Sequence, residues 1–190
     1  MSKKPQREIV VVKLSDDDQL LKKKALETWD RARLELVQWR PFLGVMAMQL
    51  EIIPVVDYRC RTASTDGRRV FCDAEFILSQ SEEDSLFILA HEVLHCALMH
   101  FSREKGKIEQ HQMWNFAIDH EVNAVLQEDG LTVPQNAVLY HQHLGLNAEQ
   151  IYQLLLEEKL QMRGELMDDH EMEGDCKADG ECDNCSGDNG

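Results

Sequence analysis

Apolar residues recur every three or four positions in several stretches of the chain, which is the spacing of one face of an α-helix. The first stretch begins after Ser15, which forms a capping-box pattern with Asp18. It should end at Arg40, because the residue before Pro41 is disfavoured in the helical conformation. The stripe predicted to be buried consists of Leu21, Ala25, Trp29, Ala32, Leu36 and Trp39.

Three further helices are predicted by similar signals. Ser81 with Asp84 repeats the capping pattern, and Asn147 with Gln150 begins the last predicted helix. Between them, a helix is expected from about residue 110 to residue 127. Helical spacing after Ser81 is kept by Leu86, Ala90, Leu94, Ala97 and Phe101.

Shorter stretches predict strands. "EIVVVKL" at 8–14 is a strand candidate. "MQLEIIPVVDYRC" at 48–60 predicts an edge strand or two short strands, because Pro54 cannot donate a backbone hydrogen bond. Alternating residues after the turn at Asp66-Gly67 indicate a hairpin. The chain is therefore expected to be a mostly helical α+β protein with a small antiparallel sheet.

Length and charge narrow the class of protein. At 190 residues with a net charge of -15, the chain is long enough for one domain and is repelled by phosphate and anionic lipid. We therefore expect neither nucleic-acid nor membrane partners. The opening apolar run is too short for a signal peptide, so a cytoplasmic location is expected. In that compartment, the cysteines are expected to be thiols or metal ligands rather than disulfides.

The strongest chemical signal is "ILAHEVLHCALMH" at 88–100. His91 and His95 are four residues apart, so both can bind one metal ion from the same helix face. Glu92 is rotated by about 100° and can reach a metal-bound water, which is the position of a general base. His100 is rotated by about 500° from His95 on a continuous helix, so it is a poor ligand candidate.

A third ligand is expected from the helix containing "MWNFAIDHEVNAVL". Asp119 is the favoured ligand, because it lies on a polar stripe with Asn115 and Asn123 on an otherwise apolar helix. The two asparagines are candidates for contacts behind the ligands. His120 and Glu121 remain the alternative ligands.

These motifs resemble a known family. "ILAHEVLHCALMH", "WNFAIDHEVNAVL", "LNAEQIYQLL" and "TASTDGRRVFCDAEF" are similar to the putative metallopeptidase domains often found upstream of von Willebrand factor A-type domains in bacterial and phage proteins. The resemblance spans roughly residues 17–160. It implies a zincin-like fold, with the sheet over the active-site helix and with His91, His95 and Asp119 as ligands of one Zn²⁺. A partner of the von Willebrand factor A type or an ATPase would have to be on another chain.

The zincin-like fold suggests two further features of the site. An edge strand beside the metal, expected at 69–73, would pair with an extended substrate. Tyr140, His141 and His143 are candidates for oxyanion stabilisation, although a solvated loop is the favoured interpretation of their segment.

The predicted metallopeptidase domain covers residues 1–163, and 164–190 are predicted to be an acidic, flexible, cysteine-containing tail. From Glu165 to Gly190 there are ten acidic residues and one lysine, a net charge of -9. A flexible tail is favoured over a second metal site at Cys176, Cys182 and Cys185.

The sequence thus predicts a zinc-dependent metallopeptidase that acts on a peptide or protein substrate. The alternative is a non-catalytic zinc-binding scaffold that acts through a protein partner. A fourth protein ligand such as His120, in place of water, would favour the scaffold.

Overall fold

The computed structural model describes residues 14–56, 60–103 and 111–171. The chain forms two compact units, residues 1–152 and 153–190. The predicted strand at 8–14, except for Leu14, and the cysteines of the tail lie outside the described residues. The described α-helices are α1 (Asp16–Trp39), α2 (Pro41–Gln49), α3 (Ala74–Ser79), α4 (Glu82–Ala97), α5 (His100–Arg103), α6 (His111–Glu128) and α7 (Ala148–Glu171). A short 3-10 helix, η2, covers His141–His143, and the strands are β1 (Glu51–Val55), β2 (Ala63–Thr65) and β3 (Arg69–Asp73).

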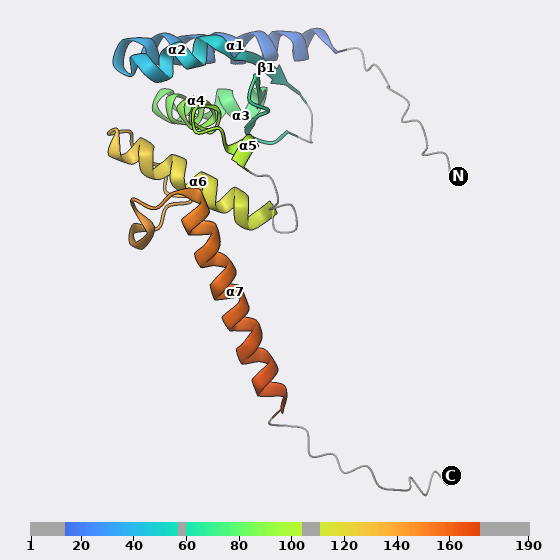
Figure 1. The fold of residues 1–190 in the computed structure, drawn as a ribbon. Coiled ribbons are helices and arrows are strands. Elements are labelled where there is room, and N and C mark those ends of the chain that lie inside the picture. The colour runs from blue at the N-terminus through green and yellow to red at the C-terminus, as the bar shows by residue number, and fades with distance from the viewer. Residues whose placement is uncertain (1–13, 57–59, 104–110, 172–190) are drawn as a thin grey trace, which may run out of the picture. The chain divides into compact units, whose positions relative to one another are not determined.

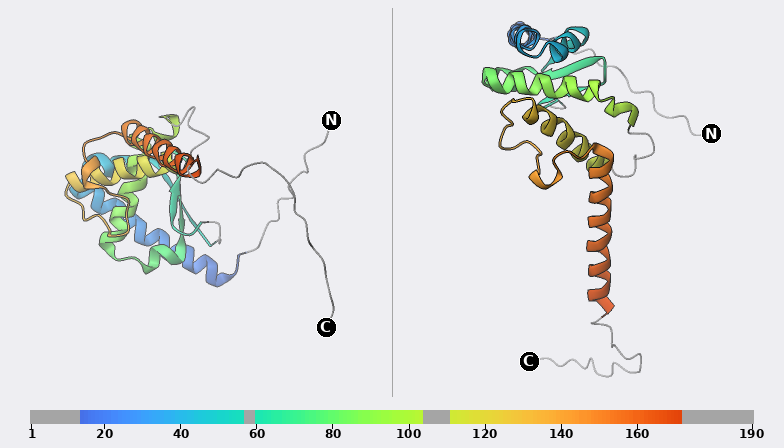
Figure 2. Two further views of the ribbon diagram at one scale, coloured as in Figure 1. Left: turned by 90° about the horizontal axis from the view of Figure 1, so that it is seen from below. Right: turned by 60° about the vertical axis from the view of Figure 1, so that its left-hand side comes forward.

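Within the first unit the elements form layers (Figure 1). Helices α1 and α2 pack on α4, and α4 in turn packs on α6. Figure 2 shows the same order from another side, with the sheet beside α4. Helix α4 is therefore enclosed between the α1–α2 layer and α6, and β2 also packs on it. None of the helices in the described ranges has an apolar stretch that could cross a bilayer.

The predicted helix starts are confirmed. The Ser15 hydroxyl accepts from the Asp18 amide at 3.1 Å, and the Asp18 carboxylate accepts from the Ser15 amide, so both halves of the capping box are present. Ser81 caps α4 by accepting from the Asp84 amide. Asn147 and Gln150 exchange the same two bonds at the start of α7.

Two parts of the predicted helical pattern are wrong. Trp39 is 64% exposed rather than buried, because α1 ends there and the chain turns at Arg40 into α2, which was not predicted. The two helices approach closely at Gly44, where a Cβ atom would lie 2.4 Å from the Val37 backbone. Phe101 is 43% exposed, because α4 ends at Ala97.

The sheet is mixed rather than antiparallel. The Asp66-Gly67 hairpin is confirmed, since β2 and β3 pair antiparallel, but β1 pairs parallel with β3 from the other side. The strand order is β1-β3-β2. The strand at 69–73 is therefore central and not at an edge, because both of its sides are paired and its Val70 and Cys72 are fully buried. The described edge strands are β1, which contains Pro54 as predicted, and β2.

The core holds α4 in place on its inner side. Leu89 and Val93 of α4 are fully buried against a cluster that includes Trp29 and Leu36 of α1 and Val70 of β3. Full burial of a side chain of this size stabilises the fold by about 1.5–3 kcal/mol. The apolar face of α4 thus fixes the orientation of its other face, which carries the histidines.

Candidate metal centre

Helix α4 brings His91 and His95 together as the spacing predicted. Their Nε2 atoms lie 2.8 Å apart, and the ring centroids are separated by 4.5 Å. The His95 side chain is 8% exposed and that of His91 18%. Two imidazoles with converging Nε2 atoms form one half of a metal site.

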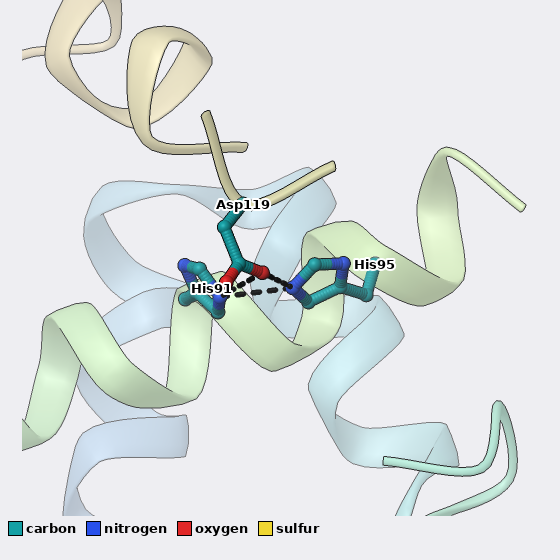
Figure 3. A group of neighbouring side chains, drawn as sticks. All are labelled: His91, His95 and Asp119. Carbon is teal, nitrogen blue, oxygen red and sulfur yellow. Dashed lines mark hydrogen bonds and ion pairs between the residues drawn. The ribbon is translucent and has the colours of Figure 1, made fainter. Parts of the chain in front are cut away.

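Asp119 supplies a third ligand atom from α6 (Figure 3). Its Oδ1 lies 3.3 Å from His95 Nε2 and 3.7 Å from His91 Nε2. In the described part of the chain, these three residues form the group of histidine, cysteine or acidic side chains that could hold a metal ion. Tetrahedral ligands at 2.0–2.1 Å from a zinc ion are about 3.3 Å apart, and the three separations of 2.8, 3.3 and 3.7 Å lie around this value.

Asn123 orients the His91 ring from behind. The Asn123 side-chain amide donates to the Val138 carbonyl at 3.0 Å, which leaves its Oδ1 facing His91 Nδ1 at 2.9 Å. An amide oxygen only accepts, so His91 carries a proton on Nδ1, and Nε2, which faces Asp119 and His95, is the nitrogen available to a metal ion. The predicted role of Asn123 thus agrees with its contacts.

His100 was predicted to point away from the site, but it lies directly behind His95. The His100 and His95 Nδ1 atoms are 2.9 Å apart, and His100 is fully buried. The prediction assumed a continuous helix, but α4 ends at Ala97 and Met99 adopts a left-handed conformation with φ 55°. This conformation is uncommon for a non-glycine residue. It turns the chain so that His100 points back toward α4.

Glu92 lies beside the ligand cluster and is 7% exposed. Burial raises the pKa of its carboxyl to about 7, with the charge of His91 opposing this shift and that of Asp119 adding to it. A carboxylate with a pKa near neutrality is suited to accepting and returning a proton.

The pKa shifts of Asp119 and His95 favour the forms that bind metal, whereas that of His91 does not. Although burial acts in the opposite direction, the hydrogen bond with Asp119 and the charge of Glu92 raise the pKa of His91, so a metal ion has to displace a proton from this ring. Although burial acts in the opposite direction, hydrogen bonds with His91 and His95 hold the pKa of Asp119 at about 2. Burial lowers the pKa of His95, with the Asp119 hydrogen bond opposing it. A carboxylate and a neutral imidazole are the ligand forms that a metal ion requires.

The three ligand residues and Glu92 line one cavity of about 660 Å³. Asp119 is 39% exposed, so the cavity admits solvent at the ligand cluster. One wall is formed by 62–65 around β2, and another by Pro134 and 136–138 of the loop after α6. Asn115 lines the same cavity, but the described hydrogen bonds do not connect it to a ligand residue.

The two alternative ligands lie elsewhere. His120 is fully buried and its Nε2 contacts the Tyr140 carbonyl at 3.0 Å. Glu121 accepts from His100 rather than joining the ligand cluster. The candidates for oxyanion stabilisation, Tyr140, His141 and His143, are not among the described residues that line the cavity, and Tyr140 and His143 pack around His120.

Comparisons with known proteins agree with the geometry. Neither the search of curated proteins nor that of solved structures found a match. A family profile described as a putative metallopeptidase domain matches residues 24–189, which is most of the chain. The matched range includes both histidines of α4 and the aspartate of α6. The chain therefore belongs to the family of putative metallopeptidase domains.

Proposed function

We propose that this protein is a zinc-dependent metallopeptidase with a zincin-like site. The proposal rests on one observation: His91, His95 and Asp119 direct three ligand atoms to one point in a solvent-accessible cavity, with Glu92 beside them. Two imidazole nitrogens and one carboxylate oxygen form a donor set typical of catalytic zinc, with a fourth position left for water or substrate. When bound, zinc acts as a Lewis acid on the peptide carbonyl and lowers the pKa of water.

Glu92 is the proposed general base. Its carboxylate takes a proton from the water that attacks the peptide carbon, and then gives this proton to the leaving amine nitrogen as the C–N bond breaks. Its position one residue after His91 gives it access to the same cavity without belonging to the ligand group. The pKa of about 7 allows both proton transfers near neutral pH.

The edge strand β2 replaces the strand at 69–73 as the proposed substrate-binding strand. It pairs with β3 on one side, and 62–65 line the cavity that contains the ligand cluster. An extended peptide would add to this edge through main-chain hydrogen bonds. The cavity also contains the side-chain amides of Asn115 and Asn136, which are the donors to test for oxyanion stabilisation.

The test combines elemental analysis with a peptidase assay on protein purified without added zinc. We expect about one zinc per chain in the wild type and in Glu92→Gln, and loss of zinc in Asp119→Ala. Cleavage of a peptide library should fall by 10²–10⁴-fold in Glu92→Gln. Glu83→Gln, on the exposed first turn of α4, is the matched control and should behave as wild type.

Two outcomes would contradict the proposal. Full zinc retention in Asp119→Ala would mean that the ligand set is wrong. Zinc binding with no cleavage of any peptide, in wild type as in Glu92→Gln, would favour the scaffold that binds zinc and acts through a partner.

A further inference from the structure

A chain of buried polar contacts begins behind His95 and leads away from the cavity. His100 on α5 contacts His95 through Nδ1 at 2.9 Å and the Glu121 carboxylate through Nε2 at 3.0 Å. His100 is fully buried, so both of its ring nitrogens are satisfied within the protein. The contacts connect α4, α5 and α6.

Glu121 is the acceptor at the end of this series of contacts, and three donors fix its position. The same oxygen, Oε2, accepts from His100 Nε2, from Arg103 at 3.1 Å and from the Ala148 amide at 3.1 Å. Its side chain is 13% exposed. A carboxylate surrounded by three donors, one of them a guanidinium, is a charged and well-oriented acceptor.

The positions of the protons follow from this acceptor. Because the Glu121 carboxylate only accepts, the His100 proton is on Nε2, and the Nδ1 atom of a neutral His100 carries a lone pair. That lone pair can accept only if the His95 proton is on Nδ1. His95 Nε2, which lies 2.8 Å from His91 Nε2 and 3.3 Å from Asp119 Oδ1, then accepts from the His91 ring and is the nitrogen without a proton that ligation requires.

We propose that His100 and Glu121 form a relay that holds His95 in the tautomer that ligates the metal. They are positioning residues, since neither lies in the ligand cluster. His91 is held by the neutral amide of Asn123, whereas His95 is held by a charged acceptor acting through a second imidazole. This inference rests on the proposed zinc site, although the tautomers can be measured without metal.

The test uses the full chain labelled with ¹⁵N-histidine. Long-range ¹H–¹⁵N spectra of the metal-free protein report which ring nitrogen of each histidine carries the proton, and zinc affinity is measured by competition with a chelator. In wild type we expect opposite neutral tautomers, Nδ1–H for His95 and Nε2–H for His100. In Glu121→Gln this pairing should be lost, and the Kd for zinc should rise 10–100-fold.

Glu149→Gln is the matched control. Glu149 also accepts from Arg103, at 3.0 Å, whereas the ring nitrogens of His100 contact His95 and Glu121, so both tautomers and the zinc affinity should stay as in wild type. His100→Phe keeps a ring of similar size and is expected to weaken zinc binding to the same extent as Glu121→Gln. Circular dichroism confirms that each variant is folded.

The outcomes separate this inference from the proposed function. A proton on His95 Nε2 in wild type, or a folded Glu121→Gln with unchanged tautomers and zinc affinity, would overturn the relay and leave the zinc site intact. If the wild type binds no zinc, the proposed function fails, and the tautomers of the metal-free protein still decide whether the relay exists.

Discussion

Two groups of histidines, one at the ligand cluster and one around His120 of α6, differ in how their nitrogen atoms are used. In the ligand cluster, His91 and His95 have a partner behind each ring, and their Nε2 atoms converge on Asp119. Around His120, the rings of Tyr140 and His143 pack with centroids 6.3 and 5.9 Å away. The buried Nδ1 atoms of His120 and His143 have no hydrogen-bond partner among the described residues.

The difference shows that residue type alone does not make a metal site. In the first cluster the Nε2 atoms converge and each Nδ1 atom has a partner on the far side of its ring, whereas the second cluster is held by ring packing and by the contact of His120 Nε2 with the Tyr140 carbonyl. The second cluster was the source of an alternative ligand, His120, and of two oxyanion candidates. Its position outside the cavity removes the fourth protein ligand that would have favoured a closed, structural site.

The largest effect is expected from removing a ligand of the first cluster. His95→Ala removes a ligand, so zinc content should fall from about one per chain to background. His143→Ala, in the second cluster, should keep the wild-type zinc content. Elemental analysis of both folded variants measures this, and zinc loss in His143→Ala would show that the two clusters share one site.

The next effect concerns the burial of Glu92 in metal-free protein. Its pKa is raised from 4.5 to about 7 in the folded state, so the folded protein binds a proton that the unfolded chain has released between these pH values. Stability therefore falls as pH rises through this window, by on the order of 3 kcal/mol. Glu92→Gln should lack this loss.

Urea unfolding at pH 5 and pH 8 in the presence of a chelator measures the difference. Glu83→Gln, which changes an exposed carboxylate on the same helix, should follow the wild type. Equal pH dependence in wild type and Glu92→Gln would contradict the burial of this carboxylate.

A smaller effect is expected from the contact behind His91. Asn123→Ala removes the acceptor of His91 Nδ1, which should weaken zinc binding by 10–100-fold, or about 1.4–2.7 kcal/mol. Asn115→Ala is the matched control, since it removes an exposed asparagine on the same helix. If both variants bind zinc equally well, Asn123 stabilises the fold through its hydrogen bond to Val138 and does not orient His91 for zinc binding.

The smallest effect tests the turn that positions His100. Met99→Gly removes the cost of a left-handed conformation at φ 55°, but it also adds freedom to the unfolded chain, so stability should change by less than about 1 kcal/mol. Met99→Val should destabilise by about 1–2 kcal/mol, because a β-branched residue is poorly accommodated there. Thermal unfolding measures both, and a Met99→Val protein as stable as wild type would contradict the strained turn.

Local signals predicted much of the fold correctly. The starts of α1, α4 and α7 follow from side chains that bond within their own first turn, and the hairpin follows from Asp66 and Gly67. Helices α2 and α3 were missed. Pro41 was read as the end of one helix, although it also stands at the first position of the next.

The pairing of His91 with His95, with Glu92 beside them, could be predicted from the sequence, because one turn of helix places residues four apart on one face. The polar stripe of the α6 sequence favoured Asp119 as a ligand. The packing of α6 on α4 was needed to place its Oδ1 atom 3.3 Å from His95 Nε2. The strand order and the return of His100 to His95 could not be predicted from the sequence and follow from the tertiary structure. Both depend on where chain segments turn and on which distant surfaces they bury, and a periodic pattern carries no information on either.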